Sequence, residues 1–146
     1  MSTIEIDYLT KDFYKAISFR NSQPPEFDTL DILFYEDGTL VNNSFSEPID
    51  FTTSSFVEAM QSQVASGDME QFMQREIFSK TEVFGKIAQR ISVYEYNFSD
   101  QEVPRMPRGI NFILFIQVEG NWRIVSMAWN DENENHVIPE EYLRGS

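Results

Sequence analysis

The sequence predicts a single α+β domain in which three amino-terminal helices pack on a long antiparallel sheet. Two observations support this prediction. Apolar residues recur at helical spacing as far as Gly67, and from Met69 onward they alternate with polar residues as they do in strands. The 146 residues are 41% hydrophobic and include 13 Phe, which is enough for one core. We therefore expect one domain over 1–146, with its core at about 7–131 and an acidic tail at 132–146.

Three segments carry the apolar spacing of an amphipathic helix. The first covers about 7–20. The second begins near Pro25, a residue suited to the first helical position, and ends at Asp37-Gly38. The third begins at Ser55, which has capping-box spacing to Glu58, and ends before Gly67. Between the second and third helices, we expect a short strand at 38–43 and a loop at 44–51.

Four longer strands follow, because the apolar period changes from 3.6 to 2. Their expected ranges are 72–84, 87–98, 110–119 and 122–131. Gly85-Lys86 and Gly120-Asn121 each supply the two residues of a tight hairpin turn. The segment 100–108 contains Pro104 and Pro107 and is expected to be a loop.

The last hairpin is predicted by pairing residues across Gly120-Asn121, since directly opposed residues share a face. This pairing places Phe112 and Leu114 on the same face as Met127 and Trp129. The opposite face then holds Ile113, Phe115 and Ile124 with several polar residues. Because both faces are partly apolar, we expect helices to cover one and a second subunit to cover the other. The predicted assembly is therefore a homodimer through the sheet face.

Composition excludes several classes of function. The formal net charge of −13 and the scattered basic residues argue against a nucleic-acid partner, and no apolar run is long enough to span a membrane. The chain has no Cys, one His, no HExxH motif and no dinucleotide-binding or P-loop motif, so we expect no cofactor and no metal. The acidic start of the chain does not resemble a secretory signal, which favours a cytoplasmic location.

Three stretches, taken in order, resemble the nuclear transport factor 2-like superfamily: Phe13–Ala16, Leu33–Val41 and Gly120–Met127. The resemblance covers about 7–131. It implies a cone-shaped domain with an internal pocket between the helices and a strongly curved antiparallel sheet. The superfamily includes ketosteroid isomerases, SnoaL-type polyketide cyclases, scytalone dehydratase, limonene-epoxide hydrolase and binding modules, so the fold leaves the function open.

The resemblance allows each family reaction to be tested on residues of this chain. Tyr14 matches the isomerases' helix-one oxyanion donor, but Asn42 stands at the position of their catalytic base, and an amide cannot take up a proton there. Their second, protonated acid falls at Leu114, or at Phe112 if the turn lengths differ. The dehydratase scheme needs pocket His residues, whereas His136 lies in the tail. No Asp-Arg-Asp set matches the hydrolase.

Candidate site residues each have two interpretations. Tyr14 and Asn42 either contact a ligand or serve the fold, Tyr14 by packing its ring and Asn42 by bonding local backbone. Met127 and Trp129 either line the pocket or belong to the core. Asp131 either lies at the pocket mouth as an acid or base, or is solvated where the acidic tail begins. Three further charged residues, whose orientation the pattern leaves open, are expected to form structural ion pairs: Glu76, Glu82 and Arg90.

The leading hypothesis is a dimeric domain that binds a small apolar organic molecule. The predicted ligand-binding residues are Tyr14, Asn42, Phe112, Leu114, Met127 and Trp129. One alternative is a cofactor-independent isomerase, cyclase or hydrolase, with Tyr14 and Asp131 as its candidate catalytic residues. The other alternative is a protein-interaction module that docks through its sheet face.

Overall fold

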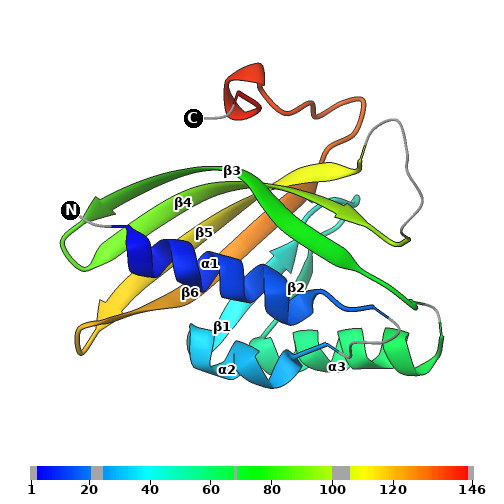
Figure 1. Cartoon of the computed structure of the whole chain (residues 1–146), viewed down its shortest axis with the longest axis horizontal. Coiled ribbons are helices and arrows are strands. Elements are labelled where there is room, and N and C mark those ends of the chain that lie inside the picture. Colours follow the sequence, from blue (N-terminus) through cyan, green and yellow to red (C-terminus); the bar gives the residue numbers. More distant parts are fainter. Residues whose placement is uncertain (1–2, 21–24, 68, 100–105, 145–146) are drawn as a thin grey trace.

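The computed structural model of the chain describes residues 3–20, 25–67, 69–99 and 106–144. The elements are shown in Figure 1. The helices are α1 (Ile4–Ile17), α2 (Leu30–Leu33) and α3 (Thr53–Ala65), with short 3₁₀ turns at Phe27–Thr29 and Glu140–Tyr142. The strands are β1 (Phe34–Asn42), β2 (Ile49–Phe51), β3 (Met73–Phe84), β4 (Ile87–Asn97), β5 (Arg108–Val118) and β6 (Asn121–Asp131).

The six strands form one sheet in the order β2-β1-β6-β5-β4-β3. All neighbouring pairs are antiparallel except β1 and β6, which run parallel, so the prediction of an antiparallel sheet is wrong at this pair. No hairpin joins β1 to β6, and the chain between them is long enough to return in either direction. The sheet twists without curling strongly, so the expectation of a strongly curved sheet is wrong (Figure 1).

Helices cover one face of the sheet, which we call the inner face (Figure 1). α1 lies across β3 and β6, and α3 lies against β1 and β2. Alternate residues of β4, β5 and β6 point into the core that forms beneath the helices. The largest fully buried side chains there include Tyr94, Phe115, Ile113, Ile124 and Met127. We call the opposite face the outer face.

The second predicted helix is much shorter than expected. A 3₁₀ turn and one turn of α2 end at Leu33, and Phe34 already begins β1, which was predicted to start at Gly38. Phe34 fits the helical stripe but is buried as the first residue of the strand instead. The third helix begins earlier than expected, because Thr52 is its N-cap and forms a capping box with Ser55. The short strand β2 was predicted to be loop.

The hairpin between β3 and β4 forms as predicted, with Phe84 opposite Ile87 and Gly85 at a positive φ of 58°. The last hairpin does not, since its turn is Glu119-Gly120 and Val118 faces Asn121. This turn alone would keep the predicted faces, but a bulge between Leu114 and Phe115 then shifts the pairing by one residue and exchanges them. The prediction that Phe112 and Leu114 share a face with Met127 and Trp129 is therefore wrong.

Candidate functional site

A cavity of about 240 Å³ lies between the helices and the inner face of the sheet. Most of its wall is apolar or aromatic. These wall residues are Phe13, Ile17, Phe51, Phe56, Ala59, Met60, Phe72, Phe98 and Trp129. Several rings meet at close to right angles, as between Phe56 and Trp129, whose centroids are 6.2 Å apart. The remaining lining residues are polar: Asn42, Gln63, Gln74, Tyr94, Tyr96, Asn111 and Asp131.

Asp131 is the one charged side chain among the described residues that line this cavity. It ends β6 and lies opposite Gly109 of β5, which in turn lies opposite Tyr94 of β4. A Cβ atom at Gly109 would overlap the Tyr94 hydroxyl. The missing side chain therefore lets Tyr94 reach across β5 and donate a hydrogen bond of 2.5 Å to Asp131 Oδ1.

Both tyrosines beside Asp131 hold their protons firmly. Burial, followed by the negative charge of Asp131, raises the pKa of Tyr94 far above its ordinary value of about 10. Burial, the same charge and a hydrogen bond to Asp131 raise the pKa of Tyr96 to about 12. The two hydroxyls are therefore neutral donors at physiological pH, and both face the same carboxylate.

Asn111 of β5 lies diagonally across the sheet from Asp131, because it faces Trp129 in the neighbouring strand. Its side chain is only 2% exposed. The Nδ2 atom lies 3.4 Å from the sulfur of Met127, but the Oδ1 atom has no hydrogen-bond partner within the described part of the chain. A buried amide oxygen without a partner is costly.

A second polar cluster lies at the other side of α1. Arg90 is 4% exposed and binds Glu76 through two hydrogen bonds of 2.5 and 3.0 Å, while its Nη1 atom donates to Asp7 at 2.6 Å. Burial alone would lower the pKa of Arg90, but Glu76 and Asp7 more than offset this and raise it. This cluster contains the structural ion pair expected for Arg90, and Glu76 is its partner.

Tyr14 belongs to this second cluster. Ser92 Oγ donates to Glu76 Oε2 at 2.6 Å and lies 2.8 Å from the Tyr14 hydroxyl. Because the Ser92 proton is directed at the carboxylate, Tyr14 donates to Ser92. Burial raises the pKa of Tyr14. Tyr14 is buried and borders a wide groove between α1 and β3 rather than the cavity.

The structure brings together three of the predicted site residues. Asn42, Trp129 and Asp131 line the cavity, although Asn42 Oδ1 also accepts a bond of 3.1 Å from the backbone of Ser44. Met127 lies beneath the cavity floor and is 2% exposed. Phe112 and Leu114 point away from the cavity and are 61% and 41% exposed on the outer face, because the bulge between Leu114 and Phe115 exchanges the faces beyond it.

The sequence analysis missed the partners of Asp131. Tyr94, Tyr96 and Asn111 were not among its candidate residues, yet they form the polar end of the cavity. One signal was available. Side chains with polar groups occupy alternate positions of one strand, at Arg90, Ser92, Tyr94 and Tyr96. Polar groups on a buried strand face need hydrogen-bond partners, so such a row indicates a polar cluster.

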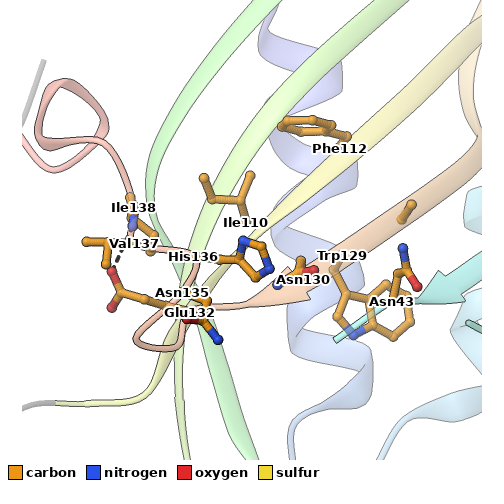
Figure 2. A pocket seen from close by; sticks show the side chains of 11 residues that line it. Asn43, Ile110, Phe112, Trp129, Asn130, Glu132, Asn135, His136, Val137 and Ile138 are labelled. Carbon is orange, nitrogen blue, oxygen red and sulfur yellow. Dashed lines mark hydrogen bonds between the residues drawn. The ribbon is translucent and has the colours of Figure 1, made fainter. Parts of the chain in front are cut away.

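A second pocket lies on the outer face, where the carboxyl-terminal segment folds back over the sheet. Figure 2 shows His136 and Ile138 of this segment near Ile110 of β5. The segment is held by an ion pair of 3.0 Å between Arg108 and Glu132, and Glu132 also accepts a bond from the Ile138 backbone. The acidic tail is therefore anchored at its start and covers one end of the outer face.

Two further properties concern only the described residues. Within residues 3–20, 25–67, 69–99 and 106–144, no three His, Asp or Glu side chains are grouped closely enough to hold a metal ion. In the same ranges, no helix combines the length and apolar composition needed to cross a bilayer.

No protein-family model matches the sequence, and no curated protein matches it. Solved structures do match. An NTF-2 like protein of unknown function from Silicibacter pomeroyi is 18% identical, with a TM-score of 0.61 over 90% of this chain and 100% of its own. A protein of unknown function with a cystatin-like fold from Nostoc punctiforme is 10% identical, with a TM-score of 0.69 over 90% and 92%. An uncharacterized cystatin-like protein from Caulobacter vibrioides is 16% identical, with a TM-score of 0.66 over 91% of each chain.

The chain therefore has the nuclear transport factor 2-like, or cystatin-like, fold, and the resemblance in the sequence is confirmed. At these identities the likeness establishes the fold alone. Because one fold hosts many functions, the function has to be argued from the cavity itself.

Proposed function

We propose that this protein binds a small organic molecule in the cavity between its helices and its sheet, as the internal pocket of a cone-shaped domain. The observation that supports this most directly is the make-up of the cavity wall. Aromatic and aliphatic side chains form most of the wall, and the polar groups gather around Asp131. Such a combination is typical of sites that recognise small ligands.

The size of the cavity limits the ligand. A dry cavity of about 150 Å³ in another protein accepts benzene. The 240 Å³ available here has room for one ring with a short substituent. A larger molecule would have to displace side chains from the aromatic wall.

Binding without catalysis is the function that the geometry supports best. The cavity offers Asp131 as its single candidate acid or base among the described residues, and two tyrosines already donate hydrogen bonds to it. Tyr14, the proposed oxyanion donor, is buried against Ser92 and faces the groove outside the cavity. The corrected register also points Ile113 inward in place of Leu114, so β5 supplies no carboxylate to the cavity.

Blocking the cavity tests this proposal. Ala59 lies on α3 and lines the cavity, so Ala59→Phe should fill it, whereas Gln61→Phe adds the same ring at an exposed position of the same helix. Phenylethanol is the probe. Its binding is followed by Trp129 fluorescence in a Trp122→Phe background, which removes the only other tryptophan.

We expect phenylethanol to bind the parent and Gln61→Phe proteins with equal affinity and to lose binding in Ala59→Phe. Circular dichroism establishes that both variants are folded. Equal binding by Ala59→Phe would place the ligand outside the cavity and overturn the proposal.

We also propose that the protein is a homodimer through its outer face. The part of this face that the carboxyl-terminal segment leaves open carries exposed apolar side chains from three neighbouring strands: Phe84 (83%), Ile87 (52%), Phe112 (61%) and Leu114 (41%). An exposed group of large apolar residues usually marks an interface. A second copy of the chain presents the same patch, so the two can be buried together about a twofold axis.

Light scattering after size-exclusion chromatography tests the dimer. We expect twice the monomer mass for the parent and the monomer mass for a Phe112→Ser, Leu114→Ser double variant. Glu36→Ser, at an exposed position of β1 away from this patch, is the control. A monomeric parent would refute the homodimer and favour a different protein as the partner of this face.

A further inference from the structure

The charge and hydrogen-bonding capacity of the cavity define the chemical class of its ligand more narrowly than its shape does. No Lys, Arg or His occurs among the described residues that line it. Asp131 forms no ion pair with any described residue, in contrast to Glu76, which binds Arg90. The cavity therefore contains an acid without a cation to neutralise it.

The hydroxyl that donates to Asp131 is not available to an anionic ligand. The Tyr94 hydroxyl is directed at Asp131, and burial together with the charge of Asp131 keeps both Tyr94 and Tyr96 protonated. Asn111 adds a buried oxygen that still lacks a donor. Asn111 and Asp131 are diagonal neighbours on the same face, so their Cα atoms lie about 7–8 Å apart, within reach of one ligand head group.

The rest of the wall is suited to a positive charge. The faces of Tyr, Trp and Phe rings attract cations, most strongly when water is excluded. Trp129 and Tyr96 line the same cavity as Asp131, and Trp129 lies directly opposite Asn111 and two residues before Asp131 on the same strand. The net charge of −13 additionally favours the approach of a cation from solution.

We infer that the ligand is a small aromatic or aliphatic amine, bound as a primary or secondary ammonium ion. Its N–H groups donate to Asp131 and to Asn111 Oδ1, and its apolar part lies among the rings of the cavity wall. This inference rests on the proposed function, since it assigns a ligand class to the same cavity.

Three probes of similar shape separate the inference from the proposed function. Phenylethylamine is cationic, phenylethanol is its neutral counterpart and phenylacetate is anionic at neutral pH. Each is titrated into the Trp122→Phe protein, with Trp129 fluorescence as the signal. Because a charge-assisted hydrogen bond contributes more than a neutral one, we expect the amine to bind about 10- to 100-fold more tightly than the alcohol.

The variant Asp131→Asn keeps the shape of the side chain and removes its charge. We expect it to abolish the preference for the amine, because the amine loses an ion pair whereas phenylethanol loses only the charge assistance of one hydrogen bond. Asp31→Asn makes the same charge change on the exposed surface of α2 and should keep the preference. Asn111→Leu, which removes the unpaired oxygen, should weaken amine binding to a smaller extent.

Each remaining outcome has a definite meaning. Equal binding of the three probes, or tightest binding of phenylacetate, would overturn the amine assignment and leave the proposed function standing. An amine preference that survives in Asp131→Asn would also overturn it, because the net negative charge of the protein would then account for the preference. If no probe binds the parent protein, the proposed function itself fails.

Discussion

Replacing Arg90 by Met should destabilise the protein more than any other single change in a charged residue of the inner face. The guanidinium is 4% exposed and donates to Glu76, Asp7 and Thr81. Its removal leaves the Glu76 carboxylate, whose side chain is 19% exposed, without a cation. Breaking a buried pair on one side costs about 3–5 kcal/mol, a large part of a typical total stability of about 5–15 kcal/mol.

The two carboxylates that bind Arg90, those of Glu76 and Asp7, contribute unequally to the stability of the protein. The Asp7 side chain is 51% exposed, so its contact with Arg90 is largely screened by water. Asp7→Asn should therefore cost less than about 1 kcal/mol. The double variant Arg90→Met, Glu76→Met should lose less stability than Arg90→Met alone, because replacing both partners by apolar groups leaves no unpaired charge.

Urea unfolding followed by circular dichroism measures these differences. With a slope of about 2 kcal/mol per molar urea, Arg90→Met should lower the midpoint by about 1.5–2.5 M. The reasoning would be refuted if Arg90→Met and Asp7→Asn shifted the midpoint equally. It would also be refuted if the double variant Arg90→Met, Glu76→Met lost as much stability as Arg90→Met alone.

Three further predictions follow from the cavity and from α3. Tyr96 has a pKa of about 12 in the folded protein, against about 10 when unfolded, so its neutral form stabilises the fold fully below about pH 10. That stabilisation is lost as pH rises through 12, and urea unfolding over this range should show a shallower loss in Tyr96→Phe than in the parent. Gly109→Ala should cost about 1–3 kcal/mol because its methyl group meets the Tyr94 hydroxyl and ring and the Asn130 carbonyl, and it should cost less thermal stability in a Tyr94→Leu background, where the ring is gone. Thr52→Ala removes the oxygen that accepts from the Ser55 backbone and should cost about 1 kcal/mol in the same assay, whereas Thr52→Ser should cost little.

The sequence pattern predicts the order of the long elements well because each strand is long enough to show its period. It fails where two patterns compete. Phe34 satisfies both a helical stripe and the start of a strand, and the chain uses it in β1. The strand β2 is only three residues long, with two of them exposed, and so carries no readable alternation.

The register of the last hairpin shows why the site was predicted only in part. Gly120 adopts its positive φ of 83° in the observed turn and suits the alternative turn equally. The two turns differ by two residues of register and leave the faces unchanged, whereas the bulge between Leu114 and Phe115 shifts the register by one and exchanges them. Alternation identifies the buried face only when the other face is polar. Here the outward face carries Phe112 and Leu114, so the pattern favours neither register. Asp131 could be proposed as a site residue from its place at the strand end, whereas the proposal of Asn111 requires the correct strand register.

Glu76 and Asp131 show how one sheet face can carry two carboxylates with different roles. Glu76 is placed beside Arg90 by a bulge in β3 that turns its side chain inward, and the pair is complete without a ligand. Within the described residues, the Asp131 carboxylate accepts hydrogen bonds from neutral tyrosine hydroxyls. Neutral donors stabilise a carboxylate but leave its charge uncompensated, and in a confined aromatic cavity that charge favours a cation.

A positively charged side chain in the cavity wall should therefore take the place of the ligand's ammonium group beside Asp131. A Gln63→Lys variant places an ammonium group in the cavity wall, and it should abolish phenylethylamine binding while Gln61→Lys, on the exposed side of α3, does not. Undiminished amine binding in Gln63→Lys would show that the Asp131 charge is not what holds the ligand.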